Sequence, residues 1–209
     1  KEAPDAKYII VSNPVDIMTY VFTKISGLPE NQIMGSGTIL DTARLRYGLS
    51  EHFKVAQGNI HAYVFGEHGD TSFIPWTGAY ISGLSTDEYY EEMKAHGKDV
   101  KPLDKEAMLE YVQKSGGKVI AKKGATFYAV SATVCQLVGL ILAASDSLAT
   151  VSSMLHGEYG IEDVCLSTLT LVGPNGTQGK VQMRMNKEEI ALLKKSADAL
   201  KEVIAQIEL

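Results

Sequence analysis

Cysteine is scarce in this sequence of 209 residues, which contains only Cys135 and Cys165. The two lie far apart in the chain, and each has apolar neighbours. We therefore expect two buried free thiols rather than a disulfide, because disulfides are rare in reducing compartments and free cysteine is usually buried. No secretory signal opens the sequence, so we expect a cytoplasmic location.

Positive charge is also in short supply. The sequence has 20 Lys and Arg against 25 Asp and Glu, which gives a net charge of -5. Excess negative charge disfavours binding to nucleic acids and to anionic membrane surfaces. We therefore expect neither as a partner.

One long stretch without charge is present, at residues 125–145, and it approaches the length of a membrane span. Thr126, Ser131, Thr133 and Gln136 make the stretch more polar, and no second candidate span accompanies it. These features favour a helix buried in the core of the protein over a membrane helix.

Complete nucleotide and metal motifs are missing. The run Gly35–Gly37 begins like a nucleotide-binding turn, but Leu40 stands where the third glycine would be, and no P-loop lysine follows. His61 and His68 do not have the usual spacing of zinc ligands, and no cysteine lies near them. We expect no metal site.

The chain starts at Lys1 and passes almost at once into an apolar run, Tyr8–Val11, which is typical of a buried strand. A turn follows, and then a helix is predicted over residues 15–25. Ligands bind at the carboxyl ends of such strands, which makes Asn13 a candidate site residue. Since a buried parallel strand needs neighbours, we expect the chain to be the C-terminal part of a longer protein.

The rest of the pattern predicts an α/β protein with one large domain or two small ones. Further helices are expected at residues 38–49, 87–94, 104–123, 125–145 and 187–206. Further strands are expected at residues 59–65, 71–76, 164–172 and 180–185. The run Gly173–Gly176 indicates a hairpin between the last two strands, and Asn186 is a suitable N-cap for the last helix.

His68 is the leading candidate for a catalytic residue. Histidine titrates closest to neutrality, so it can hold and release a proton at physiological pH. A lone histidine is more often structural, but Gly66 and Gly69 flank this one and allow a tight backbone that exposes the imidazole.

Asp41 and Arg44 lie upstream, three residues apart in a predicted helix, so both point to one side. A carboxylate can orient an imidazole and stabilise its charge. An arginine can hold a substrate carboxylate through two parallel hydrogen bonds. With His68, these residues suit chemistry at the carbon next to a carboxylate.

These residues resemble the NAD-dependent L-lactate dehydrogenases of the lactate/malate dehydrogenase family, especially the bacterial enzymes, over their C-terminal two-thirds. The resemblance is carried by Val11–Asp16, Gly35–Arg44, Gly66–Asp70, Lys123–Thr126 and His156–Gly160. It implies that residues 1–35 form the last strand–helix unit of a Rossmann-type, dinucleotide-binding sheet. Residues 36–209 would form the catalytic domain.

The resemblance also implies a reaction, the reversible transfer of hydride between NADH and pyruvate. His68 would be the general acid, Asp41 would hold its other ring nitrogen, and Arg44 would bind the substrate carboxylate. Asn13 and Thr126 would contact the substrate.

The cofactor NAD would contact Val11, Ser12 and Asn13, and the bond between Asn13 and Pro14 would be cis. The glycine-rich fingerprint of the family and its mobile lid with a second arginine precede the part present here. We therefore expect this chain alone to be inactive.

Two alternatives stay open. Malate and other 2-hydroxy-acid dehydrogenases share the fold and the set of histidine, aspartate and arginine, although Thr126 and the run Ile74–Trp76 are closer to the lactate branch. The second alternative is an inactive, oligomerising piece of such an enzyme.

Arg44 and Arg46 are two residues apart on one predicted helix and project about 200° apart, so they cannot serve the same site. The resemblance implies that Arg46 and His61 bind fructose 1,6-bisphosphate as an activator at a subunit interface. It also implies a homo-oligomer, with a tetramer expected. Since His61 must be protonated to help, activation should be stronger at mildly acid pH.

Overall fold

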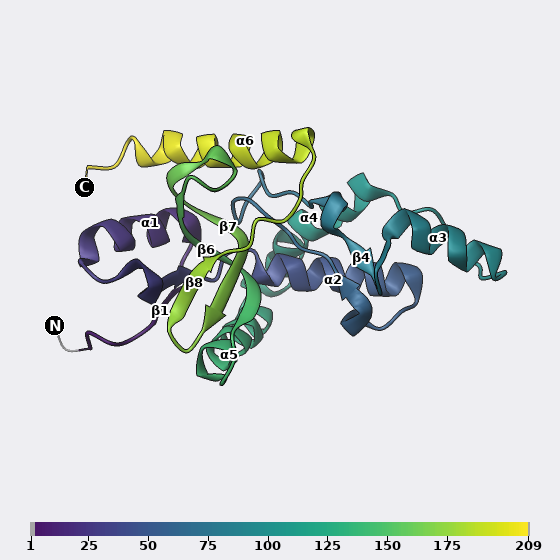
Figure 1. Ribbon diagram of the computed structural model, residues 1–209, viewed down its shortest axis with the longest axis horizontal. Coiled ribbons are helices and arrows are strands. Elements are labelled where there is room, and N and C mark those ends of the chain that lie inside the picture. Colours follow the sequence, from purple (N-terminus) through teal and green to yellow (C-terminus); the bar gives the residue numbers. More distant parts are fainter. Residues whose placement is uncertain (1–2, 209) are drawn as a thin grey trace.

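The structure is a computed structural model that describes residues 3–208 (Figure 1). Its helices are α1 (Val15–Ser26), α2 (Ile39–Phe53), α3 (Thr86–Ala95), α4 (Lys105–Lys123), α5 (Tyr128–Leu142) and α6 (Lys187–Ile204). Its strands are β1 (Tyr8–Ile10), β2 (Ile33–Gly35), β3 (Ile60–His61), β4 (Tyr80–Ile81), β5 (Leu84–Ser85), β6 (Ser147–His156), β7 (Glu162–Gly173) and β8 (Gly176–Lys180).

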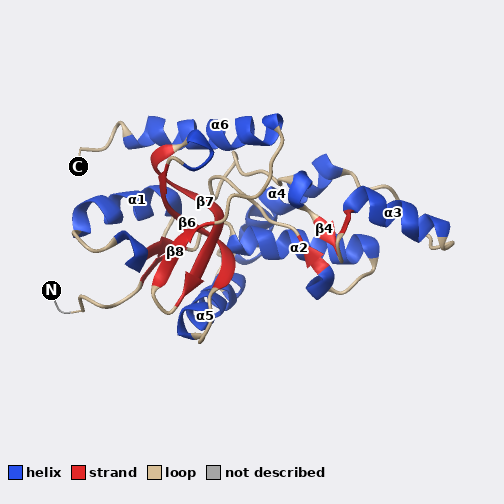
Figure 2. Cartoon of the chain, in the orientation of Figure 1, coloured by secondary structure: helices blue, strands red, loops and turns tan. Residues whose placement is uncertain are grey.

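The larger of the two sheets has the strand order β1-β2-β6-β7-β8. β1 and β2 are parallel, and the other neighbours are antiparallel. Helices α1 and α6 lie on one side of this sheet and α5 on the other (Figure 2). The α/β class is confirmed, and the predicted hairpin joins β7 to β8 where Gly173 pairs with Gly176.

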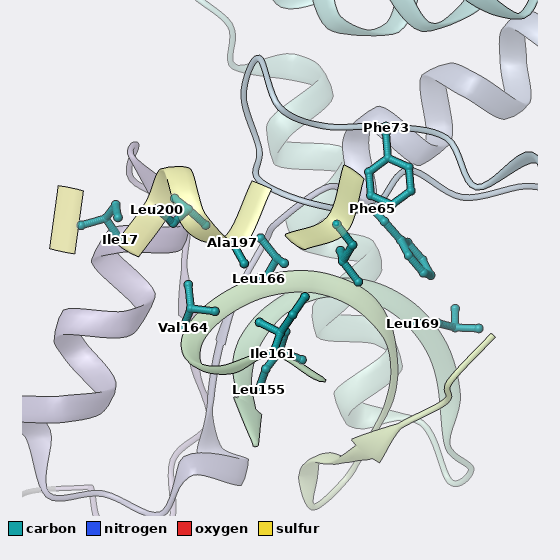
Figure 3. Close-up of a cluster of buried hydrophobic side chains, with 11 residues drawn as sticks. Ile17, Phe65, Phe73, Leu155, Ile161, Val164, Leu166, Leu169, Ala197 and Leu200 are labelled. Atoms are coloured by element: carbon teal, nitrogen blue, oxygen red, sulfur yellow. The ribbon is translucent and has the colours of Figure 1, made fainter. Parts of the chain in front are cut away.

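The main core lies between this sheet and the two helices α1 and α6 (Figure 3). α6 begins at the predicted N-cap, where the Asn186 side chain accepts a hydrogen bond from Glu189 N and the Glu189 carboxylate accepts one from Asn186 N. Leu193, Ala197 and Leu200 follow at helical spacing and are buried. This stripe fixes α6 over β6 and β7.

The smaller sheet, β3-β4-β5, is antiparallel and packs with α2, α3 and α4. Leu45, Leu49 and Phe53 of α2 and Val112 of α4 are buried in its core. α2 therefore contributes to both parts of the molecule, because its first residue, Ile39, packs in the core of the larger sheet.

Several predicted strands differ from those observed. The strand predicted over 59–65 is β3, which ends at His61, and the strand over 71–76 is reduced to a single bridge between Phe65 and Phe73. The last strand ends at Lys180 rather than beginning there. β2 and the long β6 were missed, since β6 is rich in small polar residues that hide the alternation of a strand.

The prediction of a buried helix over 125–145 was wrong in its burial. α5 is helical, but only Thr133 and Leu137 are buried within it, and Tyr128 and Leu142 are 73% and 80% exposed. Cys135 lies on this helix and is exposed, so the expectation of two buried thiols fails there, while Cys165 is buried and both cysteines are free. No helix in the described range is long and apolar enough to cross a membrane.

Candidate active site

A cavity of about 230 Å³ lies where the end of β1, the start of α2 and the loop at residues 66–70 meet α4 and α5. It is lined by most of the residues predicted for the site, namely Val11, Asn13, Asp41, Arg44, His68 and Thr126. The structure therefore brings together side chains from five separate segments of the sequence.

His68 and Asp41 are in direct contact. The Nδ1 atom of His68 lies 2.6 Å from Oδ2 of Asp41. The Asp41 side chain is 9% exposed and that of His68 is 28% exposed. The carboxylate of Asp41 is thus buried, while the imidazole of His68 is partly exposed and lines the cavity.

Hydrogen bonds between α2 and the strand-like segment before His68 fix this pair. Thr38 donates from Oγ1 to the Val64 carbonyl at 2.5 Å, and Val64 N donates to the Thr42 hydroxyl at 3.0 Å. Both threonines are buried. Asp41 lies between them on α2, so these bonds set its position relative to the loop of His68.

The loop itself is anchored to β7 and α6. Gly66 exchanges backbone hydrogen bonds with Ser167, and Glu67 N donates to the Ser196 hydroxyl at 2.7 Å. Gly66 has a φ of 96°, and a Cβ there would lie 2.9 Å from Ser196 Oγ, so this position requires glycine. Gly69 lies outside the left-handed region, and a Cβ there would meet the Glu67 carboxylate at 2.9 Å.

Asp16 is a site residue that sequence analysis missed. It lies in the first turn of α1, is 3% exposed, and accepts a hydrogen bond from the backbone N of His68 at 2.7 Å. Burial raises the pKa of Asp16 to about 6, against the hydrogen bond from His68. Its position within the Asn13-Pro14-Val15-Asp16 turn was the only signal in the sequence.

The pKa of His68 is raised above its ordinary value. The main cause is the hydrogen bond to Asp41, and the charges of Asp41 and Asp16 act in the same direction. Burial and the charge of Arg44 oppose the rise. Two carboxylates therefore favour the imidazolium form at the wall of the cavity.

Arg44 lies beside this pair, with Nη1 donating to Asp41 Oδ1 at 3.0 Å. Its side chain is 16% exposed and lines the cavity. Within residues 3–208, no hydrogen bond uses its Nε or Nη2 atoms. A cationic group with unused donors is thus available in the cavity for an anion.

α4 closes the cavity through a residue that the sequence gave no reason to select. Gln113 donates from Nε2 to the carbonyls of Asp70 and Ser72 at 3.1 and 2.9 Å. It also lines the cavity. Gln113 therefore connects α4 to the loop that carries His68.

The remaining predicted residues are Val11, Ser12, Asn13 and Thr126. Asn13 and Val11 line the cavity at the end of β1, but Ser12 does not reach its wall. The bond between Asn13 and Pro14 is cis. Thr126 also lines the cavity, in the turn between α4 and α5.

Arg46 and His61 lie elsewhere. Arg46 lines a second cavity, of about 190 Å³, between α2 and α5. Its Nε donates to the Ala62 carbonyl at 3.0 Å, and its guanidinium lies 5.0 Å from the centre of the Tyr63 ring. His61 is exposed, precedes Ala62 in the chain and does not line that cavity. Arg44 and Arg46 thus face different cavities, as the helical geometry predicts.

Comparison with known protein families shows which family the chain belongs to. Residues 38–208 match the profile of the lactate/malate dehydrogenase alpha/beta C-terminal domain. The chain belongs to the lactate/malate dehydrogenase family. Residues 1–35 match the NAD binding domain of the same family, which confirms NAD as the expected cofactor.

Two relatives within this family are bacterial enzymes. The chain is 45% identical to an L-lactate dehydrogenase of Acetivibrio thermocellus over 98% of this chain and 64% of that protein. It is 44% identical to L-lactate dehydrogenase 1 of Clostridium acetobutylicum, over 99% and 65%. The chain therefore spans slightly less than two thirds of the length of these relatives.

Solved structures agree. An L-lactate dehydrogenase from Clostridium thermocellum superposes with a TM-score of 0.87 at 36% identity, over 97% of this chain and 65% of that one. A minor L-lactate dehydrogenase from Enterococcus mundtii, in a ligand-bound form, gives a TM-score of 0.90 at 32% identity, over 98% and 64%. The resemblance to the family is thus confirmed in sequence and in fold.

The cavity fits the reacting end of the family's cofactor. Its volume of about 230 Å³ is below the range of about 300–1,000 Å³ for pockets that enclose a drug-sized ligand. A whole dinucleotide exceeds it, but a nicotinamide ring beside a small acid does not. Val11 and Asn13 lie at the carboxyl end of β1, which is where parallel strands meet ligands.

Proposed function

We propose that the protein carrying this chain is an L-lactate dehydrogenase, which interconverts pyruvate and lactate with NADH and NAD. The observation that carries the proposal is that one carboxylate, Asp41, contacts both His68 and Arg44, at 2.6 and 3.0 Å, at the wall of one cavity. A proton donor and an anion anchor that share one carboxylate partner suit a small 2-oxo acid.

In the proposed reaction, bound NADH supplies a hydride to the carbonyl carbon of pyruvate. His68 donates the proton that the carbonyl oxygen takes up. Since Nδ1 is held by Asp41, the proton comes from Nε2. The raised pKa of His68 favours the protonated form that this step requires. In the reverse direction, neutral His68 accepts the hydroxyl proton of lactate.

Binding in the correct orientation falls to Arg44, Asn13 and Thr126. Arg44 holds the substrate carboxylate, which directs the carbonyl toward His68. Asn13 would contact the substrate and the nicotinamide, and Val11 would lie on the cofactor side. Ser12, which does not line the cavity, would contact the cofactor only outside it. Thr126 also lines the cavity and would lie near the methyl group of pyruvate.

This function is tested by measuring NADH oxidation with pyruvate and with oxaloacetate, using the purified protein in its full length. We expect pyruvate to give a kcat/KM at least tenfold higher. A higher value for oxaloacetate would assign the protein to the malate branch. Turnover of neither, with NADH binding intact, would support the inactive alternative.

We also propose a homotetramer located in the cytoplasm, with fructose 1,6-bisphosphate as an activator at Arg46 and His61. Large apolar side chains of α5, including Tyr128 and Leu142, are exposed, and this supports an oligomer because exposed apolar surface can mark interaction sites. Two observations support an anion site. Arg46 lines a cavity, and His61 is next in sequence to Ala62, whose carbonyl accepts a hydrogen bond from Arg46.

The activator proposal is tested with pyruvate saturation curves, measured with and without millimolar fructose 1,6-bisphosphate at pH 6 and pH 8. We expect stronger activation at pH 6 than at pH 8. Arg46→Gln should remove activation and leave basal turnover unchanged. Curves that are identical with and without fructose 1,6-bisphosphate, at both pH values, would refute an activator site.

A further inference from the structure

Lys180 is a partly buried amine that the proposed reaction does not use. It ends β8, and its side chain lies against β6 and β7. Nζ donates to the Ser153 carbonyl at 3.4 Å and to the Thr170 hydroxyl at 3.2 Å, and it contacts the Ser153 hydroxyl. Among residues 3–208, no carboxylate lies within ion-pair distance of this amine.

These neighbours accommodate both protonation states of the amine. Serine and threonine hydroxyls rotate, so they accept from an ammonium group or donate to the lone pair of a neutral amine. Burial lowers the pKa of Lys180 to about 8. The charges of Cys165 and Glu158 act in the opposite direction, but burial outweighs them.

The amine also has space in front of it. Lys180, Ser153 and Thr170 line a cavity of about 180 Å³. An apolar cavity of about 150 Å³ holds a benzene molecule, so a compound of a few carbon atoms fits here.

The lining of this cavity carries carboxylates. Glu30 and Glu158 line it, and both are tied to His156: His156 Nε2 lies 2.6 Å from Glu30 Oε2, and His156 N donates to Glu158 Oε2 at 2.6 Å. Two carboxylates thus line the cavity that holds Lys180, and His156 is paired with them, so an anion in this cavity meets repulsion. An uncharged compound meets no such repulsion.

We propose that Lys180 is a covalent modification site, which takes small uncharged aldehydes from this cavity and forms an imine with them. The neutral amine attacks the aldehyde carbon, a C–N bond forms, and the carbonyl electron pair moves to oxygen. Transfer of the nitrogen proton to that oxygen and loss of water leave the imine. The step consumes one amine and one aldehyde, releases one water, and needs no oxidant or reductant.

The advantage over exposed lysines follows from the neutral fraction. At pH 7 an amine with a pKa of about 8 is roughly 10% neutral, whereas one at about 10.4 is roughly 0.04% neutral. Lower basicity also makes the amine a weaker nucleophile, which cancels part of this difference. We expect a net preference of at least tenfold at pH 7.

The test treats the full-length protein with acetaldehyde and sodium cyanoborohydride, which reduces imines to stable N-ethyl amines. Peptide mass spectrometry then compares labelling of Lys180 with that of Lys54, whose side chain is 76% exposed. We expect a ratio of at least ten at pH 7. The ratio should fall as the pH rises to 10, because the neutral fraction of ordinary exposed lysines then increases as well. A ratio of one or less at pH 7 would overturn the proposal.

Glyoxylate, an anionic aldehyde, tests the effect of the two carboxylates that line the cavity. We expect the ratio of Lys180 to Lys54 labelling to be at least threefold lower with glyoxylate than with acetaldehyde. Glu158→Gln should raise the glyoxylate ratio and leave the acetaldehyde ratio unchanged. Equal ratios for the two aldehydes would contradict the preference for uncharged compounds. Neither labelling measurement depends on dehydrogenase activity.

Discussion

His68 and Lys180 are both partly buried basic groups beside a cavity, yet their surroundings act on them in opposite directions. His68 has Asp41 on its ring and Asp16 on its backbone, and its pKa is raised. Lys180 has hydroxyls and a carbonyl, and its pKa falls to about 8. Burial opposes positive charge at both sites, so the presence of carboxylate partners decides the sign of the shift.

The largest expected effect comes from removing the imidazole of His68. His68→Gln should lower kcat for pyruvate reduction about 10²–10⁴-fold, which is the usual contribution of general acid–base catalysis. Steady-state kinetics of the full-length protein measure it. His156→Gln is the matched control, because this exposed histidine also pairs with a carboxylate, Glu30, and should keep its activity. A loss of threefold or less in His68→Gln would remove the assigned role.

The next effect concerns the anion anchor. Arg44→Lys should raise the KM for pyruvate about 10–100-fold, because a hydrogen bond to a charged group contributes about 1.5–3 kcal/mol and lysine lacks the planar fork. NADH affinity, measured by fluorescence titration, should change less than twofold. Arg184→Lys, an exchange at an exposed arginine, serves as the control. An unchanged KM in Arg44→Lys would contradict carboxylate binding there.

Removing the amine on the other side of the comparison should change stability. Between pH 8 and the ordinary lysine pKa, the unfolded chain holds a proton that folded Lys180 has lost, so the stability of the wild type rises with pH. Lys180→Met should therefore be more stable than the wild type by about 1–3 kcal/mol at pH 7, and this advantage should shrink at pH 10. Urea titrations at both pH values measure it. Lys54→Met should show no such pH dependence, and a less stable Lys180→Met at pH 7 would count against a costly buried charge.

The smallest effect isolates the second carboxylate of His68. Asp16→Asn keeps an oxygen that can accept from His68 N but removes the charge that helps raise the pKa of His68. Because reduction needs the imidazolium, the alkaline limb of kcat/KM should move to lower pH, while the rate at pH 6 stays close to that of the wild type. Asp198→Asn, at an exposed position of α6, should leave the profile unchanged. A profile of Asp16→Asn that overlays the wild type would exclude this electrostatic role.

Local signals in the sequence predicted much of the fold. The helix of α1, the capped start of α6 at Asn186 and the hairpin at Gly173–Gly176 all depend on neighbouring residues, and each is present. Asp41 and Arg44 could be placed on one face of a helix for the same reason, and the structure places them in contact.

Features that depend on distant contacts could not be predicted. Asp16 matters because it lies behind His68, which no local pattern reveals. β6 was missed because Thr150, Ser152 and Ser153 are buried in it without an apolar alternation. α5 was expected in the core because its composition is apolar, but composition alone does not say which surface covers a helix.

The shared carboxylate at the proposed substrate site has a thermodynamic consequence. Asp41 divides its two oxygens between His68 and Arg44. A bound anion that draws the guanidinium toward itself weakens the contact of Arg44 with Asp41. The Asp41 carboxylate then acts more strongly on the imidazole of His68. Substrate association and proton uptake are thus linked: binding a carboxylate strengthens the hold on the proton, and by reciprocity the protonated protein binds the carboxylate more tightly.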